Sequence, residues 1–127
     1  IRIELGIDRK TLVIGHVGRF VPVKNQSFLI DIFKYVNNIQ NNSRLLLIGG
    51  GNSKEEISYK QEMQNKVKKL GLEDKVIFTG VRGDVNNIME AMDIFVMPSL
   101  SEGFPVTLVE AQAAGLRCLV SDNVQND

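Results

Sequence analysis

Five short apolar runs are spaced along the chain, and longer amphipathic stretches separate them. The runs lie at residues 11–17, 44–48, 75–79, 93–97 and 117–121. Strands that are apolar along nearly their whole length are typical of a parallel sheet covered on both faces. The pattern therefore predicts five parallel strands joined by helical crossovers.

The stretches between the runs carry apolar residues at helical spacing. They predict helices at residues 25–39 and 53–70, a short helix starting near residue 84, and a fourth helix at residues 106–114. The apolar stripe of the first helix consists of Phe28, Leu29, Ile32, Phe33, Val36 and Ile39. Asn25 is placed to cap that helix through its side chain, and Ser53 with Glu56 forms a capping-box pattern before the second.

The alternation of strand and helix predicts right-handed crossovers and a doubly wound, Rossmann-like α/β sheet with helices on both faces. The expected strand order is 3-2-1-4-5, which places the first and fourth strands side by side. Ligands of such sheets bind at the carboxyl ends of the strands that flank this switch point. The loops at residues 18–24 and 98–106 are therefore the candidate binding loops. Residues 11–127 would form this domain, and the more polar residues 1–10 a connecting segment.

The loop after the first strand carries two cations that could bind phosphate. It contains Gly18, Arg19 and Lys24. Glycine permits close approach of a ligand, and a guanidinium and an ammonium at the end of a strand are suited to phosphate oxygens. Taken alone, this loop could equally present two solvated surface cations.

The loop after the fourth strand brings two acids to the start of a helix. It reads Glu102-Gly103-Phe104-Pro105, and the following helix directs Glu110 back toward its own N-terminus. The free N–H groups at this helix start form an anion site suited to phosphate; they belong to Gly103, Phe104, Val106 and Thr107. Because two carboxylates would repel phosphate, we expect Glu102 and Glu110 to accept hydrogen bonds from sugar hydroxyls. The alternative is that the two acids share this region by chance.

The amino-acid composition argues against several classes of function. Fifteen Lys and Arg residues balance fifteen Asp and Glu residues, which argues against a nucleic-acid-binding module. The single cysteine, Cys118, excludes a disulfide framework, and the single histidine, His16, argues against a histidine-based metal centre. Both lie in predicted strands, where we expect an inert thiol and a packed, structural imidazole. The apolar runs are too short to span a bilayer.

Taken together, the motifs resemble the donor-binding, C-terminal domain of family 4 (group 1) retaining glycosyltransferases, which have the GT-B fold. The features that match in order and spacing are Gly18-Arg19 with Lys24, the Gly49-Gly50-Gly51 loop, Phe78-Thr79-Gly80-Val81, the strand at 93–99, and Glu102-Gly103-Phe104-Pro105 followed by Glu110. The resemblance covers about residues 10–122. It implies one half of a GT-B enzyme from a group that includes many capsule and lipopolysaccharide enzymes.

The resemblance assigns roles by position. Arg19 and Lys24 would hold the donor's diphosphate and stabilise the leaving group, and Glu102 would lie near the transferred sugar. These three are the candidate catalytic residues. Glu110 would accept from the ribose hydroxyls of the nucleotide, and Val81 would present backbone groups to the base. The other candidate donor-binding residues are Gly18, Gly103, Phe104, Pro105, Val106 and Thr107.

The resemblance also implies the partners. The donor would be a UDP-sugar or a GDP-sugar, bound without a metal ion or other cofactor, and the sequence has no Asp-x-Asp motif. The acceptor, a glycan or a lipid-linked sugar, would bind a separate N-terminal domain. We therefore expect the chain alone to bind nucleotide weakly and not to turn over. No nucleic-acid partner is expected. The expected location is the cytoplasm, where nucleotide sugars reside, and contact of the Lys-rich stretch 60–69 with the inner membrane face is left open.

Two other functions remain open on the sequence. A GT-B nucleotide-sugar epimerase would share the phosphate site without needing the Glu102 loop in this form. A noncatalytic nucleotide-binding or interaction module would show no change in nucleotide affinity when Arg19 or Lys24 is removed.

Overall fold

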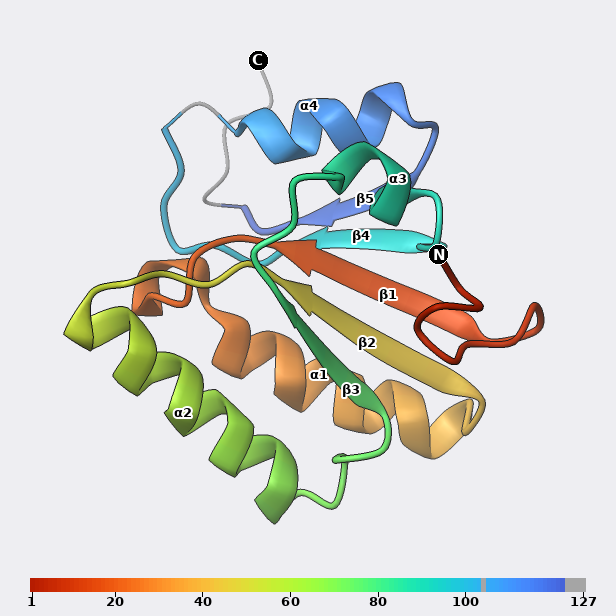
Figure 1. The fold of residues 1–127 in the computed structure, drawn as a ribbon, viewed down its shortest axis with the longest axis horizontal. Helices are drawn as coiled ribbons and strands as arrows, with labels where there is room; N and C mark the ends of the chain where they lie inside the picture. The colour runs from red at the N-terminus through yellow and green to blue at the C-terminus, as the bar shows by residue number, and fades with distance from the viewer. Residues whose placement is uncertain (104, 123–127) are drawn as a thin grey trace.

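The computed structural model, which describes residues 1–103 and 105–122, contains one five-stranded sheet. All of its strand pairs are parallel, and the order is β3-β2-β1-β4-β5 (Figure 1). The strands are β1 (Leu12–Val17), β2 (Ser43–Ile48), β3 (Val76–Gly80), β4 (Ile94–Met97) and β5 (Arg117–Val120). The predicted fold class and strand order are confirmed.

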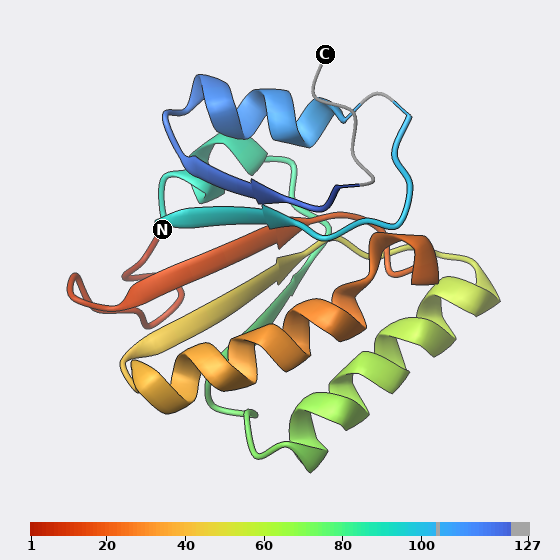
Figure 2. The ribbon, with the colours of Figure 1, turned by 180° about the vertical axis from the view of Figure 1, so that it is seen from behind.

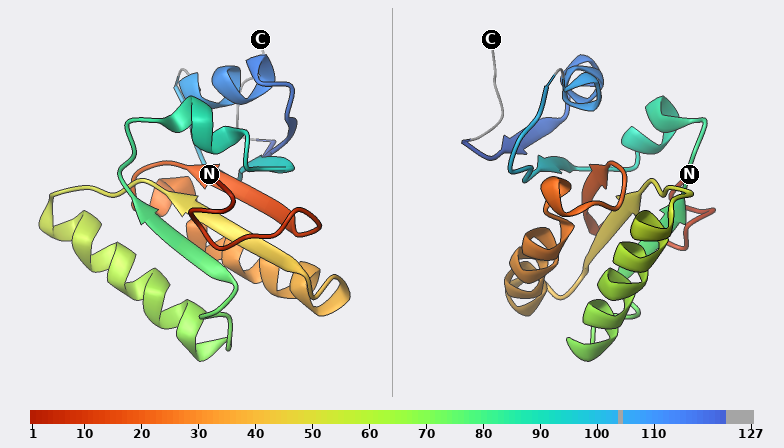
Figure 3. Two further views of the ribbon diagram at one scale, coloured as in Figure 1. Left: turned by 45° about the vertical axis from the view of Figure 1, so that its right-hand side comes forward. Right: turned by 90° about the vertical axis from the view of Figure 1, so that its left-hand side faces the viewer.

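Helices cover both faces of this sheet. They are α1 (Gln26–Ile39), α2 (Lys54–Lys69), α3 (Val85–Met89) and α4 (Val106–Ala113), and a short 3-10 turn, η1 (Pro22–Lys24), precedes α1. Helices α1 and α2 lie on one face, and α3 and α4 lie on the other (Figures 2 and 3). This is the doubly wound arrangement that consecutive right-handed crossovers produce when the chain reverses direction across the sheet.

The alternating side chains of the strands build a separate core on each face. In β2, Leu46 packs in the cluster that includes Ile88 of α3 and Leu108 of α4, whereas Leu47 packs with Phe33 of α1. Each of these five side chains is at most 3% exposed. Because both faces of the strand are buried, the strand is apolar throughout, which explains the continuous runs in the sequence.

The apolar stripe predicted for α1 is only partly buried. Leu29 and Phe33 are fully buried, but Phe28 is 53% exposed and Ile39 is 88% exposed. The stripe is wider than the surface that β1 and β2 offer, so its flank lines an apolar groove of ≈ 290 Å³ that extends to Leu119 of β5. Apolar periodicity therefore identified the helix correctly but overstated its buried surface.

The first ten residues pack against the sheet. Ile7 is buried in the core, and the Arg2 guanidinium donates to the Ala91 carbonyl at 3.1 Å and to the Asp93 carboxylate at 3.0 Å. The same Asp93 oxygen accepts from the Val13 N–H at 2.8 Å, so this segment braces the start of β1 against β4. The domain boundary at residue 10 stays a prediction.

Candidate functional site

The candidate site lies where the loops after β1, β2, β3 and β4 meet at the carboxyl ends of the strands (Figure 1). The backbone of the β1 loop is held firmly there. The Gly18 N–H donates to the Ile48 carbonyl at 2.9 Å, and the buried Gln26 side chain donates to the Arg19 carbonyl at 2.7 Å. The ring of Phe20 is 1% exposed and packs near the ring of β3 residue Phe78. The Arg19 backbone is thus fixed, while its side chain is 69% exposed.

A close backbone contact joins this loop to the end of β2. Gly49 has a φ of +129°, and a Cβ at this position would lie 2.0 Å from the Gly18 carbonyl oxygen. Any side chain would therefore push the two loops apart. Glycine at this position lets the loops after β1 and β2 lie against each other.

Lys24 and Glu102 form the central contact of the site. The Lys24 ammonium donates to Glu102 Oε2 at 2.6 Å, and the buried Ser99 hydroxyl donates to the same oxygen at 2.6 Å. The Glu102 side chain is only 7% exposed. Because the strand order places β1 beside β4, two residues 78 positions apart in sequence meet here.

The Lys24 contact keeps Glu102 ionised. Burial by itself would raise the pKa of Glu102, but the hydrogen bonds from Lys24 and Ser99 outweigh burial and hold that pKa below its usual value. A carboxylate in this state only accepts hydrogen bonds. The Lys24 ammonium has three N–H donors, and Glu102 occupies one of them, so two can be directed at another anion.

Two further hydrogen bonds join the β1 and β4 loops. The Leu100 N–H donates to the Val23 carbonyl at 2.8 Å, and the Asn25 side-chain amide donates to the Pro98 carbonyl at 3.2 Å. The predicted side-chain cap of α1 by Asn25 is therefore wrong. Asn25 has a φ of +62° and directs its amide across the switch point instead of onto the first turn of its own helix.

The predicted anion site lies at the start of α4. This helix begins at Val106, and the preceding Pro105 provides no side-chain cap. First-turn N–H groups of a helix have no partner within the helix, and this applies to those of Val106 and Thr107. Gly103 is exposed in the same loop. The predicted contact from Phe104 lies outside the described residues.

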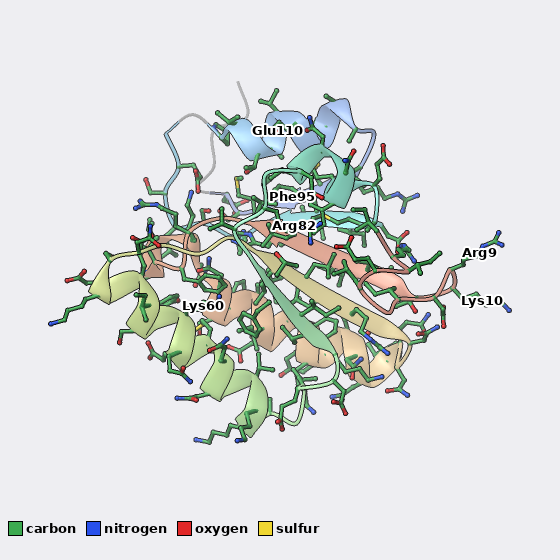
Figure 4. The ribbon with its side chains drawn as sticks, in the orientation of Figure 1. Arg9, Lys10, Lys60, Arg82, Phe95 and Glu110 are labelled. Atoms are coloured by element: carbon green, nitrogen blue, oxygen red, sulfur yellow. The ribbon has the colours of Figure 1, made fainter. Side chains whose placement is uncertain are left out.

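Glu110 lies on α4 beside the segment that follows β3 (Figure 4). It lines an open polar pocket of ≈ 490 Å³ together with residues 83–87. Val81, the residue after β3, is 79% exposed. Arg82 forms an ion pair with a neighbouring acid. Its guanidinium donates to both carboxylate oxygens of Asp84 at 2.7 Å, and these hydrogen bonds lower the pKa of Asp84. The structure thus brings Lys24 into contact with Glu102, and it groups Glu110 with the β3–α3 segment.

His16 is a packed strand residue whose ring lies close to the site. It is 1% exposed, its Nδ1 lies 3.0 Å from the Val96 carbonyl, and its buried Nε2 has no partner among the described residues. The pKa of His16 is lowered from 6.5 to about 4, mainly by burial and to a lesser extent by the Lys24 charge, while the Val96 hydrogen bond and the Glu102 charge oppose this shift. The imidazole is therefore neutral at neutral pH, with the proton on Nδ1 donated to Val96.

The depressed pKa of His16 predicts an acid-sensitive fold. Between pH 6.5 and about 4 the unfolded chain binds a proton that the folded chain excludes, so stability falls as the pH falls through this range. We expect the free energy of unfolding to drop by roughly 1.5–2 kcal/mol from pH 6.5 to 5 because of this group. Urea unfolding at several pH values measures the slope. In His16→Gln the dependence of stability on pH between 6.5 and 5 should disappear. An unchanged slope would show that His16 is not the group responsible.

The thiol of Cys118 stays protonated at neutral pH. Burial raises the pKa of the Cys118 thiol, which donates to the carbonyl of Leu116, the residue just before β5. Over the described residues, no three His, Cys, Asp or Glu side chains converge as a metal site would require. In that same part of the chain, no helix combines the length and the apolar character needed to cross a bilayer.

Sequence analysis did not single out two residues of the site. Ser99 donates a hydrogen bond to Glu102, and its position two residues after the end of β4, in the loop that carries Glu102, was the available signal. Glu56 was assigned only to a capping box, but its carboxylate lies 3.8 Å from the Arg19 guanidinium. The local pattern described the helix start and carried no information about the neighbouring loop.

The fold and the loop motifs define the class of the protein as a GT-B-type glycosyltransferase domain. The family model described as "Glycosyl transferases group 1" matches residues 1–126, and the chain belongs to this family. The resemblance expected from the sequence is confirmed.

Individual proteins that are similar in sequence to this chain are also named as glycosyltransferases. The chain is 41% identical over 119 residues to the Bacillus subtilis protein named "Putative glycosyltransferase EpsF", with 94% of this chain and 29% of the relative covered. It is 36% identical over 120 residues to the Escherichia coli UDP-Gal:alpha-D-GlcNAc-diphosphoundecaprenol alpha-1,3-galactosyltransferase, with 93% and 30% covered.

Solved structures match as well. The crystal structure of Anabaena Alr3699/HepE in complex with UDP and glucose superposes with a TM-score of 0.85 at 31% identity, covering 95% of this chain and 32% of HepE. A second crystal structure of HepE contains UDP-glucose and gives the same TM-score. The chain therefore spans between 29% and 32% of the length of these relatives.

Proposed function

We propose that the chain is the donor-binding half of a retaining hexosyltransferase that transfers a sugar from a nucleotide-sugar to a polysaccharide or lipid-linked acceptor. The observation that carries this proposal is the contact of Lys24 with Glu102 at 2.6 Å at the carboxyl ends of β1 and β4, with Arg19 in the same loop as Lys24. This is the place where doubly wound sheets bind nucleotides.

In this proposal, different residues bind different parts of the nucleotide-sugar. Lys24 and Arg19 bind the diphosphate and stabilise the charge that develops on it as the sugar leaves, assisted by the first-turn amides of α4. Glu102, held ionised by Lys24, accepts from a hydroxyl of the transferred sugar. Glu110 accepts from the ribose hydroxyls, and Val81, which is exposed, presents backbone groups to the base. Fixed cations and amides perform the role that a metal ion has in other transferases, so we propose that no metal is required.

The relatives support particular partners. HepE binds UDP and UDP-glucose, and the galactosyltransferase is named for a UDP-sugar donor and a lipid diphosphate acceptor. We propose UDP as the first nucleotide to test and GDP as the second. The proposed acceptor is a lipid-linked or capsule-type glycan, bound to a further domain. The proposed location is the cytoplasm, with peripheral contact at the inner membrane face where a lipid-linked acceptor would lie.

Calorimetric titration with UDP and then with GDP tests the donor site. We expect saturable binding that Arg19→Ala weakens by about 1.5–3 kcal/mol, the usual scale for a hydrogen bond to a charged group. Arg9→Ala is the matched control, because Arg9 is exposed and lies at the opposite end of the sheet (Figure 4). Equal affinities for wild type and Arg19→Ala would favour a noncatalytic module, and would contradict the proposed role of Arg19.

A further inference from the structure

Glu56 lies next to the candidate site, and its carboxylate is almost buried. Its side chain is 12% exposed, and its buried Oε2 has no hydrogen-bond partner among the described residues. The Arg19 guanidinium lies 3.8 Å from that oxygen. A buried acceptor without a partner destabilises the fold, so the carboxylate at this position calls for an explanation.

The start of α2 directs the carboxylate inward. The Glu56 N–H donates to the Ser53 hydroxyl at 3.1 Å, which is one half of the predicted capping box. In the other half, the glutamate side chain would accept from the Ser53 N–H, and no such bond forms. The carboxylate packs instead against Gly51, where a Cβ would lie 2.0 Å from Oε2. Glycine at position 51 leaves the space that the carboxylate occupies.

Arg19 has the freedom to use this acceptor. Its backbone is held by the Gln26 side chain, but its guanidinium is 69% exposed. A separation of 3.8 Å is an ion-pair distance and is too long for a hydrogen bond, so a small movement of the side chain would form one. The guanidinium is a planar group with five N–H donors, so one edge can bind a carboxylate while another binds phosphate.

We propose that Glu56 is a positioning residue for the donor: it accepts hydrogen bonds from one edge of the Arg19 guanidinium and so holds another edge toward the diphosphate of the nucleotide. The proposal rests on the proposed function of the site. The positioning role predicts the direction in which nucleotide affinity changes when the carboxylate is removed. A carboxylate that merely lies near a phosphate repels it, and its removal would tighten binding. A carboxylate that positions Arg19 strengthens binding, and its removal weakens it.

Titration of Glu56→Gln with UDP and GDP tests the proposal. Glutamine keeps the shape of the side chain and removes the buried charge, so we expect the variant to fold. A neutral acceptor holds a guanidinium less strongly than a carboxylate, so we expect the Kd to rise about five- to tenfold. Glu55→Gln is the matched control, because Glu55 is exposed in the same helical turn and the charge change is identical. Its Kd should stay within about twofold of wild type.

A double variant separates positioning from a purely structural role. In the Arg19→Ala background, Glu56→Gln should change the Kd by less than about twofold, because the residue it acts through is gone. An equal or lower Kd for Glu56→Gln alone would overturn the proposal, as would a full five- to tenfold effect in the Arg19→Ala background. A lower Tm with an unchanged Kd would reduce Glu56 to a structural residue and also overturn it.

The same titrations distinguish this proposal from the proposed function. If wild type binds UDP or GDP and Arg19→Ala weakens that binding, the donor site stands, and Glu56→Gln decides the positioning role alone. If wild type binds neither nucleotide, the donor site fails in this chain, and the role of Glu56 fails with it.

Discussion

Gly49→Ala is expected to destabilise the protein by about 3 kcal/mol or more, because two separate penalties act at this position. The first is the φ of +129°, which L-residues rarely adopt, and the second is the overlap of the new methyl group with the Gly18 carbonyl oxygen 2.0 Å away. Both atoms that clash belong to loops fixed by hydrogen bonds, so neither can move away cheaply. Thermal unfolding should show a Tm lower by roughly 10 °C.

Two other glycines separate these penalties. Gly71 has a φ of +72°, and no other atom lies within 4 Å of the place that an alanine methyl would take, so Gly71→Ala carries the conformational penalty alone, about 1 kcal/mol. Gly83 has neither feature, and Gly83→Ala should stay within about 0.5 kcal/mol of wild type. If Gly49→Ala were no worse than Gly71→Ala, the loops after β1 and β2 would not be in the close contact described.

Lys24→Met is expected to reduce both stability and donor binding. It leaves the Glu102 carboxylate, 7% exposed, with the Ser99 hydroxyl as its remaining donor. Removing one partner of a buried pair costs several kcal/mol, and the partial exposure of Lys24 reduces this to about 2 kcal/mol. Loss of the ammonium should also weaken UDP binding by about 1.5–3 kcal/mol. Lys10→Met, at the far end of the sheet (Figure 4), is the control for both measurements.

The stability loss in Lys24→Met should depend on pH. In wild type the lowered pKa of Glu102 means that the pair stabilises the fold above about pH 4.5 and loses this contribution as the pH falls. In Lys24→Met burial is no longer offset by the ammonium, so the pKa of Glu102 should rise, and its ionisation should destabilise the fold as the pH increases. The gap between the two proteins should therefore widen from about pH 3 to pH 7. A constant gap would show that Glu102 is not the affected group.

The sheet could be predicted because the apolar pattern of each strand is visible in its own sequence. The run that became β2 is apolar on both faces, since Leu46 and Leu47 enter different cores. Once the alternation of strand and helix is recognised, the handedness of the crossovers leaves few strand orders. The strand order 3-2-1-4-5 places the loops after β1 and β4 together. It therefore predicted that Lys24 and Glu102 would share one crevice, although 78 positions separate them in the sequence.

The remaining details depend on tertiary contacts that no local pattern contains. Asn25 matches a helix cap, but the chain adopts a left-handed conformation there and the amide reaches Pro98 on another loop. Glu56 matches a capping box, and only the packing of α2 beside the β1 loop turns its carboxylate toward Arg19. The exposure of Phe28 likewise depends on how far the neighbouring sheet extends.

The central place of β1 has a consequence for how the chain folds as it is synthesised. Among the described strands β1 is made first, and one of its edges pairs with β2 along six residues. The other edge pairs with β4, at Ile14 with Ile94 and Gly15 with Phe95, about 80 residues later. The half sheet β3-β2-β1 can therefore form while that second edge is still open. An open, apolar strand edge is a site for pairing with other chains, so the interval before β4 emerges is the period in which this protein is most exposed to misassembly.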